Sequence, residues 1–506
     1  MAGEINRRYA KYCALLAAGF GLFRAAVMGL TGPGDSESYY WAWSQHPSLS
    51  YYDHPPMVAW LIGLSTGIGG HSTFMMRLPS LILFMAMMWL LYKLAMTMFN
   101  DGRVAFHSLL IFNLFPMFGI GALQMVPDIP AAVCYLLFIL VAHKLLVNDG
   151  PRWLWYVLGV IMGVGLLGKY FEILALPCAM LLVAAVPRYR HWYARPEPYI
   201  MGVVALLFFS PVIIWNFAND WPSFKFHLVS RHHWAGFSWS NFQRLVAGQA
   251  LYSTPLYWIA ALWACWKGAA RGLKGDLNYA TLAAFSIPTL AFFYGVTWWT
   301  DEAEPHWPAF GYIPAIVMIS ALGVEGFTKW KLKTISIAKW GYGAATVMAG
   351  AAFALFYIHV FHPILPIKPK YDITNEILGW EKVGPEIQSL YDEIKRKEGK
   401  EPFTLAHHWV LCSQMMFSTD GKVPVSCINE KIDEYDFWDD EKSLAGKTAI
   451  VVTDLRFEEK PDTLYRFSKV EKVKDIPVTR GGEVTRLFTL WVGKDFNGSL
   501  VRPPLK

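Results

Sequence analysis

The class of this protein is decided by the run Leu78-Pro-Ser-Leu-Ile-Leu-Phe-Met-Ala-Met-Met-Trp-Leu-Leu-Tyr-Lys-Leu-Ala-Met-Thr-Met98. About twenty mostly apolar residues are what an α-helix needs to cross the hydrocarbon core of a membrane. Similar runs recur along the chain, and 54% of its 506 residues are hydrophobic. Only 17% are charged, which is less than a soluble protein of this length carries. The sequence therefore predicts a mainly α-helical, polytopic membrane protein.

About eleven spans are expected, because that many apolar runs approach membrane-spanning length. The run 57–66 is too short to cross, so we expect it to lie in the membrane interface, with 37–52 as a second interfacial helix. No small-residue cleavage site follows the first apolar run, so we expect that run to remain as a span. The expected spans are residues 10–30, 78–98, 104–124, 130–147, 153–168, 172–186, 199–216, 246–266, 279–298, 308–325 and 338–361.

The loops between these spans sort by charge. Alternate loops carry most of the basic residues, for example Arg7 with Arg8 and Arg188 with Arg190, and the positive-inside rule places these loops in the cytoplasm. The net charge of +6 is therefore a topology signal, and no nucleic-acid partner is expected. All the chemically rich loops fall on the opposite, exoplasmic face, where we expect a single site. They are residues 31–77, 125–129, 169–170, 217–245 and 300–307.

The composition changes after about residue 362, where charges become dense and apolar runs shorten. The segments 448–454 and 487–492 are typical of strands, and 387–397 is typical of an amphipathic helix. We therefore expect two domains. Residues 1–361 form the transmembrane domain, with 31–77 as its first exoplasmic, catalytic loop, and residues 362–506 form a small exoplasmic α/β domain.

The six cysteines show no CxxC spacing, so they predict neither a zinc site nor a redox motif. Four of them lie in or next to apolar runs and are expected to be packing residues. Cys412 and Cys427 lie in the polar C-terminal part, where they could pair if that part is outside the cytoplasm.

The first exoplasmic loop begins with acids. Asp35, Ser36 and Glu37 follow Pro33-Gly34 directly after the first span. One interpretation is a helix N-cap with an acid in the first turn. The other is a general base that deprotonates an acceptor hydroxyl. Acids are costly beside lipid, and other outer loops are acidic too, which favours the catalytic interpretation.

Later in this loop stands Tyr51-Tyr-Asp-His-Pro-Pro56. It suits a rigid aromatic turn at the membrane interface, and equally a positioned pair, Asp53 and His54, that holds a phosphate or a metal. Both interpretations stay open. The chain shows no standard metal-ligand spacing, so no cofactor is expected, and a divalent metal near Asp53 is the one exception considered.

Several cations stand in outer loops, against the positive-inside trend. Lys169 follows the end of a span, Arg77 opens another, and Arg231 belongs to a basic cluster in the loop 217–245. Snorkelling or solvated side chains would explain them, but a lipid phosphate also explains why they stand on this side. Asp128 lies at a turn before a span, where it is a helix cap, a second functional acid, or both.

Six residues are candidates for contacting a sugar or its acceptor, because aromatic faces and hydrogen-bonding groups suit a sugar ring. Interfacial anchoring is the ordinary alternative for the tryptophan. No nucleotide-binding glycine loop is visible in the sequence. The candidates are Tyr39, Tyr40, Asp53, Glu304, His306 and Trp307.

Six short motifs occur in order along the chain, and as a set they resemble the GT-C membrane glycosyltransferases of the protein O-mannosyltransferase and aminoarabinose-transferase group. The likeness covers roughly residues 9–325 and, more loosely, the C-terminal domain. It implies transfer of a sugar from a polyprenyl-phosphate donor, with inversion at the anomeric carbon, on the periplasmic face of a bacterial inner membrane. The motifs are Ser36-Glu-Ser-Tyr-Tyr-Trp41, Tyr51-Tyr-Asp-His-Pro-Pro56, Arg77-Leu-Pro79, Pro127-Asp-Ile-Pro130, Gly168-Lys-Tyr170 and His306-Trp-Pro308.

The resemblance also implies roles for residues, with one departure. The family has an Asp-Glu pair after the first span, and its Asp is the base. The aromatic anchor that follows aligns Ser36 with that Asp and Glu37 with the Glu. The base is then either Asp35, through a shifted register, or Glu37.

Three further positions follow from the resemblance. The second functional Asp of the family corresponds to Asp128, and its lysine corresponds to Lys169. A lysine that contacts the donor phosphate in the aminoarabinose branch is replaced here by His54. The implied partners are the donor lipid, the bilayer and an acceptor that is lipid A, core oligosaccharide, another envelope glycan or a protein.

Another class of membrane protein competes with this prediction. A transporter of polar solutes should place ionisable residues near the bilayer midplane and often repeats its halves. Here the charges lie at the ends of spans on one face, and no internal repeat is visible. A glycosyltransferase is therefore the expectation, with a transporter as the alternative.

Overall fold

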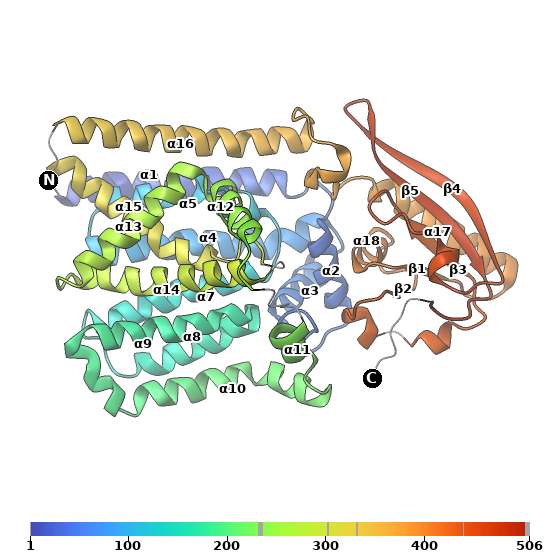
Figure 1. Ribbon diagram of the computed structural model, residues 1–506, viewed down its shortest axis with the longest axis horizontal. Coiled ribbons are helices and arrows are strands. Elements are labelled where there is room, and N and C mark those ends of the chain that lie inside the picture. The colour runs from blue at the N-terminus through green and yellow to red at the C-terminus, as the bar shows by residue number, and fades with distance from the viewer. Residues whose placement is uncertain (1, 231–235, 301–302, 330–331, 439, 501–506) are drawn as a thin grey trace. The chain divides into compact units, whose positions relative to one another are not determined.

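The structure is a computed structural model that describes residues 2–230, 236–300, 303–329, 332–438 and 440–500. The described residues form many helices and one β-sheet (Figure 1). Contacts between residues divide the chain into two compact units, each made of separate stretches of sequence. Unit 1 comprises Met1–Ala26, His54–Val58 and Ser80–Phe356, and unit 2 comprises Val27–Asp53, Ala59–Pro79 and Tyr357–Lys506.

Unit 1 is helical, as its apolar runs predict. Its core is formed by buried aliphatic and aromatic side chains from most of these helices. Three of these helices, α1, α4 and α16, each have one or more terminal residues that belong to unit 2. The helices are α1 (Ala2–Val27), α4 (Thr73–Phe99), α5 (Gly102–Leu114), α6 (Pro116–Gly119), α7 (Asp128–Leu146), α8 (Leu154–Gly168), α9 (Ala175–Ala185), α10 (Glu197–Ala218), α11 (Pro222–Lys225), α12 (Trp239–Ser253), α13 (Pro255–Gly272), α14 (Leu277–Trp299), α15 (Ala309–Lys329) and α16 (Leu332–Phe361).

Among the described residues, seven helices are long and apolar enough to cross a membrane, and an eighth span results if the bent pair Tyr170–Ala185 and Pro187–Ala194 is one span. The seven lie in α1, α4, α7, α10, α14, α15 and α16. The expected spans include shorter helices such as α5, whose 13 residues reach only about 20 Å at 1.5 Å per residue. The mainly α, multi-pass fold is confirmed, whereas the number of eleven spans stays a prediction.

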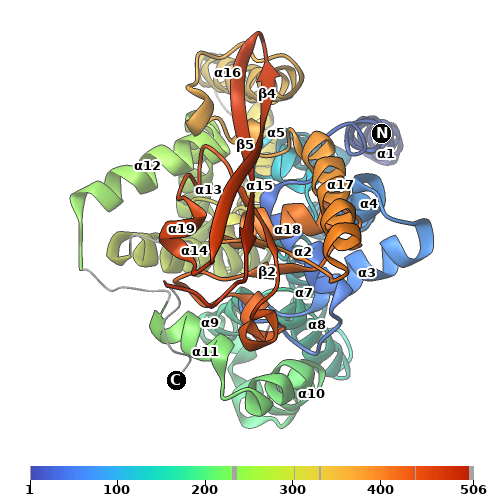
Figure 2. The same cartoon turned by 90° about the vertical axis from the view of Figure 1, so that its right-hand side faces the viewer.

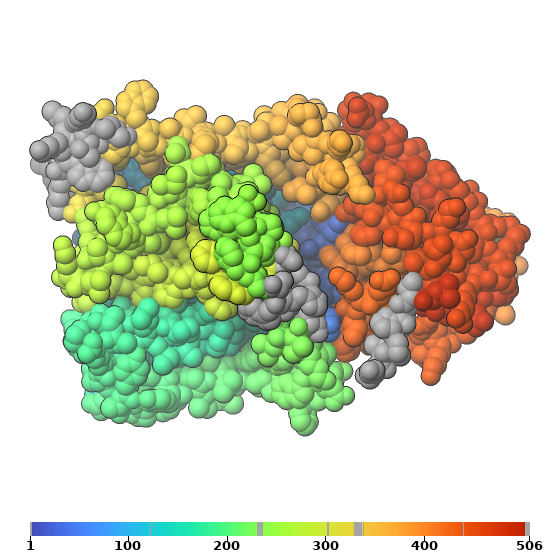
Figure 3. Space-filling model, in the orientation of Figure 1, coloured from blue at the N-terminus to red at the C-terminus, as the bar shows by residue number. Residues whose placement is uncertain are grey.

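Helix α10 shows how this unit presents itself to lipid. On one side it approaches α8 closely, because Gly159 and Gly163 leave room for its backbone; a Cβ at either glycine would lie 2.5 Å from a carbonyl oxygen of α10. The opposite side exposes large apolar residues such as Leu207 and Phe217, and α10 runs along the lower edge of Figure 3. A helix with one packed side and one exposed apolar side is suited to the periphery of a membrane bundle.

Unit 2 contains a five-stranded mixed sheet with the strand order β2-β1-β3-β5-β4. β1 pairs in parallel with β2 and β3, while β5 pairs antiparallel with β3 and β4. The long β4–β5 hairpin and α17 are prominent in Figure 2. The strands are β1 (Phe403–Ala406), β2 (Val425–Cys427), β3 (Ala449–Thr453), β4 (Lys469–Arg480) and β5 (Glu483–Lys494), and the helices are α2 (Asp35–Gln45), α3 (Met57–Gly69), α17 (Trp380–Glu398), α18 (Trp409–Ser418) and α19 (Pro461–Leu464).

The two strands and the amphipathic helix predicted in the C-terminal part are confirmed. β3 and β5 coincide with the two expected strands, and α17 contains the expected amphipathic helix. The six cysteines form no disulfide; Cys412 on α18 and Cys427 on β2 are buried thiols. The domain boundary expected at residue 361 stays a prediction.

Helix α2 belongs to the same unit as the C-terminal sheet and packs against α18. Aromatic contacts join the two helices: Tyr39 lies 4.8 Å from Trp409 and Trp41 lies 5.1 Å from Phe417, measured between ring centroids. The expected interfacial helix 37–52 is shorter in the structure, because α2 ends at Gln45. Pro47 explains this end, since a proline disfavours helical geometry in the residue before it.

Candidate active site

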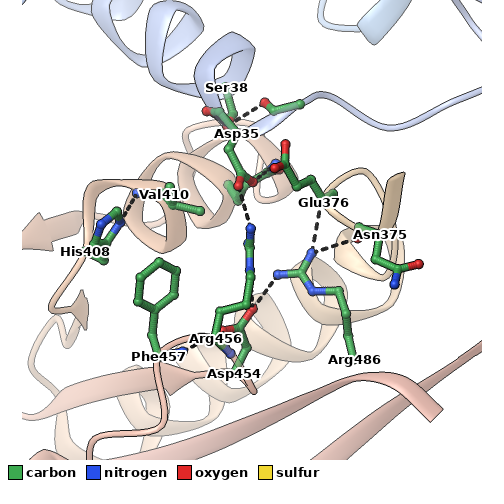
Figure 4. A network of polar contacts seen from close by, with 12 residues as sticks. Asp35, Ser38, Asn375, Glu376, His408, Val410, Asp454, Arg456, Phe457 and Arg486 are labelled. Carbon is green, nitrogen blue, oxygen red and sulfur yellow. Dashed lines mark hydrogen bonds and ion pairs between the residues drawn. The ribbon is translucent and has the colours of Figure 1, made fainter. Parts of the chain in front are cut away.

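The carboxylate of Asp35 stands at the first position of α2 and is held by residues from the C-terminal part of unit 2 (Figure 4). Its Oδ2 accepts a hydrogen bond from Arg456 Nη1 at 2.7 Å. Its Oδ1 accepts one from Gln414 Nε2 at 3.3 Å, and the same amide donates to the carbonyl of Pro33. The Asp35 side chain remains 10% exposed. It is thus ion-paired but not sealed from solvent.

Glu37 lies two residues further on α2 and is completely buried. Its carboxylate accepts three hydrogen bonds from the guanidinium of Arg77, the shortest of them 2.6 Å from Nη2 to Oε2. It also accepts the backbone N–H of Gly34 at 2.9 Å, which caps the helix. The side chains of Glu37 and Arg77 are 0% and 2% exposed. Glu37 therefore has two structural roles: it forms an ion pair with Arg77 and it caps helix α2.

Arg77 uses the rest of its donors to hold the chain between the first span and α2. Nη1 donates to the carbonyl of Met28 and to Thr31 Oγ1, and Nη2 donates to the carbonyl of Gly32. Together with the bonds to Glu37, these contacts engage all five N–H groups of the guanidinium. No N–H of Arg77 is left for the lipid phosphate that the sequence analysis assigned to it.

Asp53 and Tyr39 form a second polar contact in unit 2. The Tyr39 hydroxyl donates to Asp53 Oδ2 at 2.8 Å and accepts the backbone N–H of Glu434 at 2.9 Å. Burial, together with the charge of Asp53, raises the pKa of Tyr39 well above its usual value, so the phenol keeps its proton. Tyr39 and Tyr40 are both buried, with 4% and 8% of their surface exposed.

The acids beside Tyr39 are themselves perturbed. Burial raises the pKa of Asp433 to about 8, with a further contribution from Asp436. Burial also raises the pKa of Glu434 well above its usual value. At neutral pH both groups therefore tend to hold a proton, which reduces repulsion among the carboxyl groups that surround Asp53.

Unit 1 holds the other group of predicted site residues. Asp128 opens α7, and Lys169 follows α8 directly. Lys169 Nζ donates to Asp128 Oδ1 at 2.6 Å, with side chains 6% and 24% exposed respectively. His306 is an electrostatic neighbour of Asp128. The structure thus brings together three residues that the sequence placed in separate loops.

The remaining predicted residues of unit 1 are less closely connected. His54 lies 6.1 Å from His227 between ring centroids. Trp307 is buried, with its ring 5.3 Å from Phe171, whereas Glu304 is exposed. Arg231 lies outside the described residues.

Sequence reasoning missed several polar residues. Arg456 and Gln414 bind Asp35 from positions far along the chain, and only the dense charge after β3 could have drawn attention to Arg456. Glu172 is an acid within an expected span, which is itself a signal of function. Both its carboxyl oxygens are buried and find no hydrogen-bond partner among the described residues.

Within the described ranges, no group of three or more His, Cys, Asp and Glu side chains is arranged to hold a metal ion. The polar contacts described above contain carboxylates, a buried lysine and hydrogen-bond donors. A carboxylate can accept a proton from a hydroxyl, and a cation can stabilise charge that develops on a leaving oxygen.

Comparisons with known proteins agree with this chemistry. Residues 53–215 match the family model described as dolichyl-phosphate-mannose-protein mannosyltransferase. The chain is 23% identical to the lipid A galacturonosyltransferase of Rhizobium johnstonii, over 74% of this chain and 77% of that protein. It is also 23% identical to an undecaprenyl phosphate-α-4-amino-4-deoxy-L-arabinose arabinosyl transferase of Proteus mirabilis, over 76% of this chain and 70% of that protein.

Solved structures show the same fold. ArnT from Cupriavidus metallidurans in the apo state superposes with a TM-score of 0.62 at 16% identity, covering 95% of this chain and 98% of that one. The same protein bound to undecaprenyl phosphate also gives a TM-score of 0.62, at 15% identity. The apolar helices, the acidic first loop and these likenesses define a GT-C membrane glycosyltransferase.

Within that class, the chain is similar to the lipid A galacturonosyltransferase and to the aminoarabinose transferases among these relatives. It is a multi-pass protein of a bacterial inner membrane.

Proposed function

We propose that this protein transfers a sugar from a polyprenyl-phosphate donor to lipid A on the periplasmic face, with inversion at the anomeric carbon. The observation that carries the proposal is the likeness to a lipid A galacturonosyltransferase along three quarters of both chains. The arabinosyl transferase relative uses an undecaprenyl phosphate donor by its name, and the structural neighbour was solved with undecaprenyl phosphate bound. Core oligosaccharide, another envelope glycan and a protein are the competing acceptors.

Asp35 is the better candidate for the base. A general base must come within hydrogen-bond reach of the hydroxyl whose proton it accepts. Glu37 is fully buried and its two oxygens already accept four hydrogen bonds, so it offers a substrate no access. Asp35 keeps part of its carboxylate exposed, and among the described residues its Oδ1 accepts one hydrogen bond, at 3.3 Å. We therefore assign proton acceptance to Asp35 and helix stabilisation to Glu37.

Lys169 is the candidate for the donor phosphate. When the anomeric C–O bond breaks, its electron pair stays on the phosphate oxygen, and a nearby cation stabilises that charge. Lys169 is a buried cation, and the carboxylate of Asp128 holds its ammonium in place at 2.6 Å. His54 and Arg231 stay proposals for the same phosphate, and we give Arg77 a structural role instead.

The proposed sugar contacts are of two kinds. Glu304 and His306 are accessible enough to donate or accept hydrogen bonds, whereas Tyr39, Tyr40 and Trp307 are buried and would act by shaping the surface that a sugar meets. Asp53 is fixed by Tyr39, which suits a positioned hydrogen-bond acceptor.

The test is transfer by the purified protein in detergent. Undecaprenyl-phosphate-linked galacturonic acid and 4-amino-4-deoxy-L-arabinose would be offered separately with lipid A, and the release of undecaprenyl phosphate measured together with the mass of lipid A. We expect acceptor-dependent release with one donor and a matching gain in mass. Release without any modified lipid A would contradict the proposed acceptor, and no release from either donor would contradict the proposed sugars.

A deletion strain separates the acceptors in the cell. Mass spectrometry of its lipid A, core oligosaccharide and envelope proteins should show one sugar missing from lipid A alone. Loss of a sugar from the core or from a protein, with lipid A unchanged, would move the proposal to that acceptor.

A further inference from the structure

The candidate base is tied to a partly buried network of alternating charges in the C-terminal part of unit 2 (Figure 4). Arg456 stands between two acids: Nη1 donates to Asp35 at 2.7 Å and Nε lies 3.5 Å from Asp454 Oδ2. Asp454 accepts in turn from Arg486 Nη2 at 2.6 Å. The order along the network is therefore Asp35, Arg456, Asp454 and Arg486, with the sign of the charge alternating at each step.

This network is built to hold Arg456 in one place. Asp454 is the residue just after β3, and its Oδ1 also accepts the backbone N–H groups of Arg456 and Phe457. The charges of Arg486 and Arg456 overcome burial and lower the pKa of Asp454, so it stays ionised. Arg486 is anchored by backbone carbonyls, including that of Leu378 at 3.1 Å. An arginine fixed by its own backbone and by an ionised neighbour loses little entropy when it binds a further carboxylate.

Besides Asp35 and Asp454, a third acid, Glu376, belongs to this network and lies in the segment that precedes α17. The backbone N–H of Asp35 donates to the carboxyl group of Glu376. Burial raises the pKa of Glu376 to about 7, and the charge of Asp35 adds to the shift, while Arg456 and Arg486 oppose it. The backbone and the side chain of Asp35 are therefore both held by the C-terminal part of the same unit.

We propose that Arg456 is a positioning residue, which fixes the Asp35 carboxylate in the orientation that accepts the proton. The inference rests on the proposed role of Asp35 as the base. Two side chains donate hydrogen bonds to this carboxylate, Arg456 to Oδ2 and Gln414 to Oδ1. These two bonds restrict rotation of the carboxylate. One face of Oδ1 then remains for the acceptor hydroxyl. The C-terminal α/β part is then needed for the chemical step as well as for any selection of acceptor.

The loss of orientation can be measured as a change in kcat. A misplacement of about 1 Å at a reacting group can cost roughly 100-fold in rate. We expect Arg456→Gln to lower kcat roughly 10- to 100-fold, with the KM for the donor changed less than about twofold. Arg456→Lys should restore part of the loss, because an ammonium still reaches one oxygen but lacks the planar fork.

Arg480 is the matched control. Its guanidinium lies in unit 2 as well, with 8% of the side chain exposed, and it binds the neighbouring residues Asp372, Thr374 and Asn375 instead of Asp35. Arg480→Gln should lower the melting temperature without lowering kcat at a temperature where the variant is folded. Equal losses of kcat in the two variants would show that Arg456 matters only for folding, and an unchanged kcat in Arg456→Gln would overturn the inference. If Arg456→Gln does not fold, Gln414→Ala should give a smaller loss of kcat with the same unchanged KM.

A stability cycle separates this inference from the proposed function. Melting temperatures of Asp35→Asn, Arg456→Gln and the double variant do not depend on any substrate. If the two residues are in contact, the double variant loses clearly less than the sum of the single losses. Additive losses would overturn the contact whatever the enzyme transfers, whereas non-additive losses in a protein that releases no polyprenyl phosphate would contradict only the proposed function.

Discussion

The buried pair of Glu37 and Arg77 should be among the most sensitive ionic contacts in unit 2. Replacing Arg77 by Met removes a guanidinium that makes three hydrogen bonds to Glu37 and three to Met28, Thr31 and Gly32. Both side chains are nearly inaccessible, so the acid is left without its cation and without water. Breaking a buried ion pair in this way costs about 3–5 kcal/mol. For a unit of this size we expect a fall in melting temperature of roughly 6–20 °C.

The six buried cysteines provide the assay. None forms a disulfide, so a thiol-reactive fluorescent dye should label the detergent-solubilised protein only as it unfolds on heating. The control is Arg103→Met, the same substitution in a pair that is 37% and 23% exposed. An exposed pair contributes roughly 0–1 kcal/mol, so this variant should melt close to the unmodified protein.

A second variant distinguishes the ion pair from lost packing. Replacing Glu37 by Met together with Arg77→Met removes both buried charges at once, so the double variant should be more stable than Arg77→Met alone. A melting temperature for Arg77→Met within the range of Arg103→Met would refute the reasoning. The reasoning would also be refuted if the fall in melting temperature of the double variant equalled the sum of the falls for Arg77→Met and Glu37→Met.

Three further predictions follow from the same contacts. Lys169→Met should lower kcat/KM for the donor at least roughly 10-fold, with Lys169→Arg retaining more activity, because the proposed role needs a cation at the leaving phosphate. Equal activity of the two variants would contradict this role. Asp35→Asn should lower kcat roughly 100-fold or more, the usual contribution of a general base, and a normal kcat would remove Asp35 from the site. Stability should fall as pH rises from about 5 to 8, because Glu376 and Asp433 keep protons in the folded state that the unfolded chain releases near pH 4. Melting temperatures across this range should show the fall, Asp433→Asn should weaken it, and a rise with pH would contradict it.

Hydropathy was sufficient to predict the fold class, whereas the number of eleven spans stays a prediction. Apolar composition identifies α4 and α7 directly, because both length and hydrophobicity are local properties of the sequence. The short helices are different. A helix such as α5, with 13 residues, is apolar because it packs within unit 1, and a buried helix and a short span have the same composition.

The candidate site shows a similar division. The sequence selected Asp128 and Lys169 because each stood out in its own loop, and the structure joins them at 2.6 Å. It also selected Arg77 for a phosphate, since a lone arginine at the start of a span suggests an anion. The partner is in fact Glu37, 40 positions earlier, because a buried arginine needs a carboxylate and several carbonyls to replace its water. Hydropathy and motif spacing carry no information about which of several acids satisfies it.

The acid at position 35 illustrates why the first loop cannot be interpreted by itself. Successive residues on a helix point about 100° apart, so an Asp at 35 does not simply replace an Asp at 36. Asp35 and Glu37 accordingly have different partners, Arg456 for the first and Arg77 for the second. Arg456 lies 421 positions away from Asp35 in the sequence. It reaches Asp35 because it stands in the turn that follows strand β3. If Asp35 is the base, as we propose, the group that orients it comes from the C-terminal part of the chain, because Arg456 donates to its Oδ2 at 2.7 Å.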